Sequence, residues 1–324
     1  MSWTKVVIAA MSAAVLLAGC SSGGSGDSAG ATAPDGGPAL DGTYVFEFDV
    51  AKRTQLGAPA PRQEPLTAKW AIRSHCVDAG CTATATRLHM NGKPADTRTT
   101  LDFLDGKWVM VFAEDSKCNA GGQPARVLGT WVLEPKANNV LSGVWTEITM
   151  GQDCPWVVQM PVVVTRQSDV APDVPVSDPA GIEARRPSKP EGFQGVYNQT
   201  ITTQPPDGQP ATLPIKIDTF CVRNTDECAS IQSTKIENKP QITPLTFAGD
   251  RWVYRWDRSG RTCPDGAPST GFGFDEVFFP EASPNPLPRL TGTRRLDIGD
   301  PCPTQQLFDL VYERNNAPAP APGG

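Results

Sequence analysis

The chain has 324 residues, of which 39% are hydrophobic and 20% are charged. A formal net charge of −6 argues against a nucleic-acid-binding protein, which needs a basic surface. The sequence holds only 2 histidines, which argues against a histidine-rich metal enzyme. The length fits two domains, each large enough to bury a core of its own.

The first twenty residues have the layout of a bacterial export signal. Lys5 supplies the positive charge, and Val6 to Leu17 is an apolar run too short to span a bilayer. The segment Leu17-Ala18-Gly19-Cys20 resembles the lipobox, in which the cysteine is lipidated and becomes the new N-terminus. We therefore expect a signal peptide at residues 1–19, an acyl anchor on Cys20, and location on the outer face of the plasma membrane.

Three segments lack the bulky apolar side chains that a packed core requires. Residues 20–38 are rich in glycine and serine and predict a flexible tether. Residues 169–190 are rich in proline and predict a semi-rigid linker, and residues 316–324 predict a disordered tail. Two blocks remain, residues 39–168 and residues 191–315.

These two blocks repeat one pattern of residues, which indicates two copies of one domain. Each copy opens on a Gly-x-Tyr triplet, runs a strand into a cysteine, and carries a later strand that contains a tryptophan. The corresponding segments are Gly42–Tyr44 and Gly195–Tyr197, Trp70–Cys76 and Ile215–Cys221, Leu101–Trp108 and Leu245–Trp252, and Cys154-Pro155 and Cys302-Pro303.

Both copies show the alternation of apolar and polar residues that is typical of β-strands. In Thr43–Asp49, for example, Tyr44 and Phe46 fall on one face. Clusters of glycine, proline, aspartate and asparagine recur at short intervals, as the turns of a meander require. We therefore predict an all-β fold made of two tandem homologous small antiparallel β-barrel or sandwich domains, joined by the proline-rich linker.

Besides Cys20, each block contains four cysteines, and an even number in an exported chain indicates disulfides. Three pairings are possible within a block. We favour the one in which a close pair brackets a short turn and the other pair closes a long loop. A zinc site is the alternative, but the spacing of Cys221 and Cys228 is wider than zinc sites usually have. The favoured pairs are Cys76–Cys81, Cys118–Cys154, Cys221–Cys228 and Cys263–Cys302.

Catalytic motifs are absent from the sequence. His75 and His89 lie in the first block, and Phe220 takes the place of His75 in the second. There is no nucleophile elbow, phosphate-binding loop, dinucleotide fingerprint or calcium loop. We expect no catalytic residue, no metal and no cofactor. Several carboxylates near aromatic residues are interpreted as exposed strand or turn residues: Asp102, Asp105, Glu114, Asp250, Asp257 and Asp275.

The aromatic residues of the two tryptophan-containing strands occupy equivalent faces. Core packing is the favoured interpretation, because buried aromatic side chains dominate small β cores. The alternative is a barrel pocket for an apolar or glycan ligand. The candidate ligand-binding residues are Trp108, Phe112, Trp252, Tyr254 and Trp256.

The strand that enters Cys76, the small alternating residues of Cys81–Thr86 and the strand that contains Trp108 form a pattern with a counterpart in the second block. This pattern resembles the extracytoplasmic domains of some mycobacterial serine/threonine kinases. With the lipobox and the composition, the chain looks like an actinobacterial lipoprotein. No kinase motif is present. The resemblance implies a non-enzymatic binding or sensing module whose partners are the membrane and an unknown envelope ligand or protein.

Two other classes of function remain open at this point. One is a carboxylate-dependent cell-envelope hydrolase, which needs two carboxylates in one cleft. The other is a purely structural envelope protein with two filled cores.

Overall fold

The computed structural model describes residues 39–78, 80–118, 122–151, 154–205, 209–280 and 285–315, all within one compact unit, Thr32–Gly324. In these ranges the regular structure is β-strand with three short 3₁₀ turns, η1 (Val50–Lys52), η2 (Pro179–Gly181) and η3 (Lys189–Gly192). The expected signal peptide, the expected lipidation site Cys20, the expected tether and the expected C-terminal tail lie outside the described residues.

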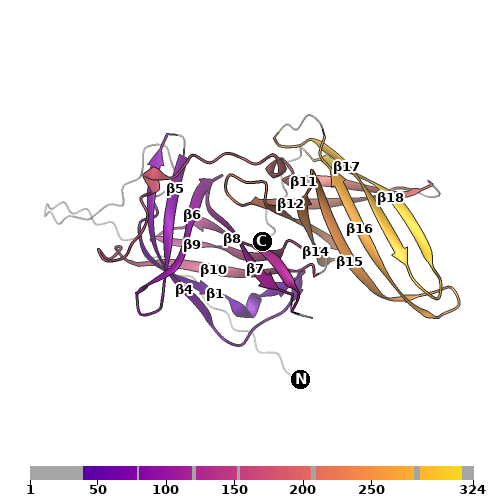
Figure 1. Ribbon diagram of the computed structural model, residues 1–324, viewed down its shortest axis with the longest axis horizontal. Coiled ribbons are helices and arrows are strands. Elements are labelled where there is room, and N and C mark those ends of the chain that lie inside the picture. Colours follow the sequence, from indigo (N-terminus) through magenta and orange to yellow (C-terminus); the bar gives the residue numbers. More distant parts are fainter. Residues whose placement is uncertain are drawn as a thin grey trace, which may run out of the picture. The chain divides into compact units, whose positions relative to one another are not determined.

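The first block forms a closed antiparallel barrel in which β1 pairs with both β4 and β10 (Figure 1). A small hairpin, β2 (Thr54–Gln55) and β3 (Ala58–Pro59), is added at the N-terminal end of β10. The barrel strands are β1 (Gly42–Phe48), β4 (Leu66–Val77), β5 (Gly80–Leu88), β6 (Pro94–Leu104), β7 (Lys107–Lys117), β8 (Pro124–Pro135), β9 (Val140–Thr149) and β10 (Val157–Ser168).

The second block forms a closed barrel of the same order, coloured from salmon-pink through orange to yellow in Figure 1. Its strands are β11 (Gly195–Gln204), β12 (Ala211–Cys221), β13 (Cys228–Ile236), β14 (Lys239–Ala248), β15 (Arg251–Thr262), β16 (Pro268–Phe278), β17 (Arg289–Ile298) and β18 (Thr304–Arg314). The predicted all-β fold of two tandem domains is confirmed, and both domains are barrels rather than sandwiches.

Local sequence explains why corresponding strands turn back at the same place. Asp105 and Gly106 join β6 to β7 with φ angles of 49° and 79°, and Gly249 and Asp250 join β14 to β15 with φ angles of 57° and 67°. Positive φ at both central residues is the signature of a type I′ hairpin, whose twist matches that of the strands it joins. Each hairpin therefore sets the register of the strand that carries the tryptophan.

The lumen of each barrel is built in rows of inward side chains that face one another across neighbouring strands. One row is shared by the two copies: a tryptophan, an aliphatic residue, a glycine and another aliphatic residue. The glycines are Gly143 and Gly292, and a Cβ added at either one would lie about 2 Å from a backbone carbonyl oxygen of the neighbouring strand. Glycine is therefore required at both positions. The rows are Trp108–Leu133–Gly143–Val162 and Trp252–Val277–Gly292–Leu310.

All four favoured disulfides are present. Cys76–Cys81 and Cys221–Cys228 join facing residues at the ends of two hairpins, with Cα atoms 4.0 and 4.1 Å apart. Cys118–Cys154 and Cys263–Cys302 close loops with sequence separations of 36 and 39.

The proline-rich segment does more than join the barrels. Thr84 and Thr86 on β5 donate hydrogen bonds to the carbonyl oxygens of Ser177 and Pro175, at 2.5 and 2.7 Å. Val174 is buried in a cluster that includes Ala71 and Leu88 of the first barrel. The first part of the linker is therefore a strap across the outside of β4 and β5, whereas the sequence predicts only a semi-rigid spacer.

An apolar cluster connects the outer faces of the two barrels. Leu128 and Ile148 of the first barrel pack with Ala229 and Ile231 of the second. Two ion pairs flank the region: Arg126 with Glu227, at 2.7 Å, and Arg223 with Asp102, at 3.0 Å.

Loop length predicts which disulfide contributes more to stability. In the chain-entropy description, closing the longer loop of Cys118–Cys154 contributes about 4 kcal/mol and the short loop of Cys76–Cys81 about 2 kcal/mol. Replacing both cysteines of a pair by alanine avoids a free thiol that could exchange. We expect urea unfolding to show the larger loss for the double variant at 118 and 154. Equal losses, or the opposite order, would contradict the loop-length account.

Candidate functional site

The structure places the sequence-predicted aromatic residues inside the barrels. Trp108 and Trp252 are 0% exposed and lie at the centres of the two cores. Phe112 packs against the first core, over Gly129 of the neighbouring strand, where a Cβ would lie 2.3 Å from the ring. These side chains fill space, so the two tryptophans present no surface to a ligand.

Tyr254 and Trp256 of the second barrel are only partly buried and stack on each other, with ring centroids 5.2 Å apart and an angle of 14° between the planes. The Trp256 ring lies against Gly273, whose missing Cβ makes room for it. The guanidinium of Arg294 lies over the same ring, 5.2 Å from its centroid. Trp256 thus brings an aromatic pair together with a partly buried cation.

The two barrels differ in the row next to the shared tryptophan row. Both rows follow from the strand register, and the four positions correspond one to one. The first barrel has Met110–Trp131–Trp145–Met160, and the second has Tyr254–Asp275–Arg294–Phe308. An entirely apolar row in one copy is therefore matched by a charged row in the other.

Asp275 and Arg294 form a bidentate ion pair inside the second barrel. Arg294 donates from Nε and Nη2 to the two carboxylate oxygens, at 2.8 and 2.7 Å. The Asp275 side chain is 4% exposed and that of Arg294 is 25% exposed. Burial raises the pKa of the Asp275 carboxyl, and the hydrogen bonds and charge of Arg294 oppose that rise. Asp275 was expected at an exposed strand or turn position; it is instead buried, because its parity on β16 points it inward.

A second group of polar side chains continues this site across the lumen. Gln199 donates to the Tyr312 hydroxyl at 2.7 Å, and that hydroxyl donates to Gln232 at 3.4 Å. Burial, reinforced by the negative charge of Asp275, raises the pKa of Tyr312 strongly and that of Tyr254 to about 12. The corresponding interior of the first barrel is apolar, with Phe46 in the place of Gln199.

The lumen of the first barrel also holds a partly buried carboxylate, that of Glu147 on β9, which accepts a hydrogen bond from the Trp156 indole at 3.2 Å. Burial raises the pKa of Glu147 and the charge of nearby Glu114 adds to the rise, whereas the bond from Trp156 opposes it. Glu147 belongs to the row that contains Phe112 and Gly129, and it corresponds to Leu296 of the second barrel.

The remaining sequence candidates do not assemble. His75 and His89 are exposed, and Asp105 and Asp250 occupy hairpin turns. Asp102 was interpreted as exposed but is 7% exposed, because Arg223 from the second barrel covers it.

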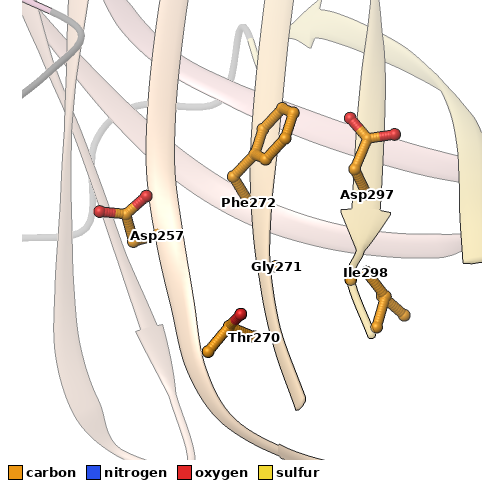
Figure 2. Close-up of a pocket in the computed structure, with 7 residues that line it drawn as sticks. Asp257, Thr270, Gly271, Phe272, Asp297 and Ile298 are labelled. Atoms are coloured by element: carbon orange, nitrogen blue, oxygen red, sulfur yellow. The ribbon is translucent and has the colours of Figure 1, made fainter. Parts of the chain in front are cut away.

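Asp257 lies on the outer face of the second barrel, beside a shallow cavity of about 490 Å³ (Figure 2). Strand register aligns it with Phe272 and Asp297 on the two following strands, so an aromatic ring stands between two carboxylates. Arg255 and Arg295 lie over the Phe272 ring, 4.9 and 5.8 Å from its centroid. The ring is therefore already packed by cations of the same sheet, which fits a solvated, ion-paired surface.

The carboxylate of Asp275 is engaged by Arg294 within the second lumen. Both oxygens of Asp275 accept hydrogen bonds from Arg294, and no second carboxylate shares that row. Within the described ranges, no three His, Cys, Asp or Glu side chains are grouped so that they could hold a metal ion. The same part of the chain has no helix long and apolar enough to cross a bilayer.

Residues 37–181 match the family model described as the PknI serine/threonine-protein kinase sensor domain. The first barrel is similar to a kinase sensor domain. The resemblance to extracytoplasmic domains of mycobacterial kinases is thereby confirmed. The matched range runs beyond the last barrel strand to Gly181 and so includes the strap that packs on β5.

The serine/threonine-protein kinases PknI of Mycobacterium tuberculosis and Mycobacterium bovis are 30% identical to this chain over 155 residues. The match covers 44% of this chain and 26% of each kinase, so the chain spans about a quarter of their length. Among solved structures, the monomer form of the M. tuberculosis PknI sensor domain is 28% identical, with a TM-score of 0.40. That alignment covers 46% of this chain and 99% of the sensor domain.

From the sequence, Asp275 was interpreted as exposed, and Arg294 was not singled out because it belongs to no catalytic motif. A comparison of the two copies position by position would have found them, because Asp275 and Arg294 replace two tryptophans of the sensor-like first barrel.

The ion pair predicts a non-additive pair of substitutions. Arg294→Met alone leaves the Asp275 carboxylate buried without its partner and should destabilise the chain by about 3–5 kcal/mol. Asp275→Leu with Arg294→Met should recover most of that loss, since the first barrel shows that this row accepts apolar side chains. Urea unfolding of both single variants and the double variant measures the coupling. A double variant as unstable as the Arg294 variant would refute it.

The raised pKa of Glu147 predicts the direction of a pH effect. The folded chain binds the Glu147 proton more tightly than the unfolded chain does. The contribution of this proton to the free energy of unfolding is therefore complete below the ordinary pKa of 4.5, and it is lost as pH rises through the pKa of the folded chain. Glu147→Gln keeps an acceptor for Trp156 without the charge. It should raise the free energy of unfolding by up to about 1 kcal/mol at pH 7 and change it little at pH 4.

Glu47 supplies the control for this experiment, because it is exposed on β1 and stays in water in both states. Urea unfolding of Glu147→Gln and Glu47→Gln from pH 4 to pH 7.5 compares them. If both variants respond alike, buried Glu147 is not the cause.

Proposed function

We propose that this chain is an extracytoplasmic sensing module, held on the outer face of the plasma membrane by a lipid on Cys20. It binds an envelope ligand or protein and carries out no reaction on it. The observation that carries the proposal is the match of residues 37–181 to the sensor domain of a serine/threonine kinase. The chain has no kinase motif of its own, so it would pass its signal to a separate partner.

The disulfides support a location outside the cytoplasm. Each barrel contains two disulfides. Structural disulfides persist in oxidising compartments and are rare in reducing ones. The export signal and lipobox of the sequence agree with this compartment.

The ion pairs of Asp102 and Asp275 argue against these two carboxylates as the catalytic pair of a hydrolase. Asp102 and Asp275 are each held by an arginine, at 3.0 and 2.7 Å. A glycoside hydrolase needs a protonated acid and a second free carboxylate within one cleft. Neither Asp102 nor Asp275 is available in that form.

Cys20→Ala tests the anchor. It should remove the acyl group and move the protein from the detergent phase to the aqueous phase in a phase-partition experiment, since an acyl chain contributes about 0.8 kcal/mol per buried CH₂. Ser21→Ala, which changes the next residue and keeps the cysteine, should partition as the wild type does. Detergent partitioning of Cys20→Ala equal to that of the wild type would disprove lipid anchoring.

Protease added to intact cells tests the side of the membrane. The anchored chain should be degraded without lysis, while a cytoplasmic marker protein survives. Protection until lysis would contradict the extracytoplasmic proposal.

A further inference from the structure

A cavity of about 880 Å³ lies where the outer face of the first barrel meets the second barrel and the linker. Its volume falls within the range of small-molecule sites, which occur preferentially at domain interfaces. One wall is apolar and comes from the outward residues of β7, β8 and β9 in the first barrel: Val109, Val111, Val132 and Val144.

The rest of the lining is strongly charged. Five cationic side chains and four carboxylates line the cavity, so positive charge is in slight excess. Asp102 and Glu191 both pair with Arg185, at 3.8 and 2.6 Å, and Asp218 pairs with Lys216 at 2.7 Å. Three of the four carboxylates therefore have partners within the lining.

One hydrogen-bond donor of Arg223 is left without a partner. Its Nε donates to both oxygens of Asp102, at 3.2 and 3.0 Å, but its buried Nη2 has no hydrogen-bond acceptor. A buried guanidinium N–H without an acceptor is unfavourable, and native structures almost always satisfy such groups. Nη2 has no accessible surface in this conformation, but the Arg223 side chain is 18% exposed and lines the cavity, so a small rotation of the guanidinium would bring this donor to an acceptor supplied by a ligand.

We propose that this cavity binds an amphiphilic anion, with its acidic group on Arg223 and its apolar body along the valine wall. A guanidinium binds carboxylate and phosphate oxygens through charge-assisted hydrogen bonds. An apolar chain that covers the valines removes their apolar surface from water, which favours binding. Val144 is 39% exposed when no chain covers it. The inference deepens the proposed sensing function by naming the class of ligand. Because the barrels and the linker each contribute to the walls, the ligand would contact all three.

Calorimetric titration of the purified, oxidised chain tests the site, with Cys20→Ser in the background so that no acyl group is attached. The probes are dodecanoate, dodecanol and dodecyltrimethylammonium, which share a chain and differ in charge. Dodecanoate should bind at least about tenfold more tightly than the other two, because only it supplies a charged acceptor. Equal binding of dodecanol, or no binding of dodecanoate, would overturn the proposal.

Arg223→Gln should weaken dodecanoate binding by about tenfold or more. Its matched control is Arg126→Gln, since the pair of Arg126 and Glu227 also joins the two barrels but does not line the cavity. The control should stay within about twofold of the starting affinity. Equal losses in both variants would mean that the contact between barrels matters and the Arg223 donor does not.

A second pair of variants avoids the buried charges. Val144→Glu places a negative charge in the cavity from an exposed position and should weaken dodecanoate binding about tenfold. Val163→Glu makes the same change at a valine that is 45% exposed on β10 and absent from the cavity wall. If Val144→Glu binds dodecanoate as well as Val163→Glu does, the site is elsewhere. Failure here leaves the protease and detergent tests of the sensing module untouched, so the two proposals fail separately.

Discussion

Closure of each sheet into a barrel is the constraint on which the other features depend. Once β1 meets β10 and β11 meets β18, the parity of every strand is fixed, and each inward residue has a set neighbour on the next strand. Small residues must then stand where strands come close. Gly143 and Gly292 are these small residues, each in the same inward row as a buried tryptophan. Both copies therefore keep the same barrel geometry.

Within this frame, the two copies have come to differ in what they place inside and outside. The sensor-like first barrel fills its second row with Met and Trp side chains, and the second barrel puts Asp275 and Arg294 there. The outer faces of the two barrels also differ, in which apolar side chain is covered. Leu128 of the first barrel is covered by the second barrel, whereas the corresponding Phe272 stays at the surface between arginines. A buried ion pair is more costly than an apolar pair of similar volume, so stability alone does not account for it.

Much of the fold could be read from the sequence. Alternation identified strands, the repeated Gly-x-Tyr and tryptophan motifs identified two copies, and the even number of cysteines identified the disulfides. These signals are local or rest on a comparison within the chain. The strap formed by Val174 and its neighbours was missed, because proline-rich segments have the same composition whether they pack or not. Only the matching threonine donors on β5 distinguish the two cases.

The sequence by itself determined the class of fold and the duplication and favoured the observed cysteine pairing, because periodicity and spacing express them directly. The tertiary structure decided which carboxylates are buried. Asp275 and Asp257 look alike in the sequence, but their strand parities send one inside the barrel and the other to the surface. Tertiary structure also decided that Arg223 meets Asp102, since residues 121 positions apart are brought together only when two barrels pack. Long-range contacts of this kind leave no periodic trace in the chain.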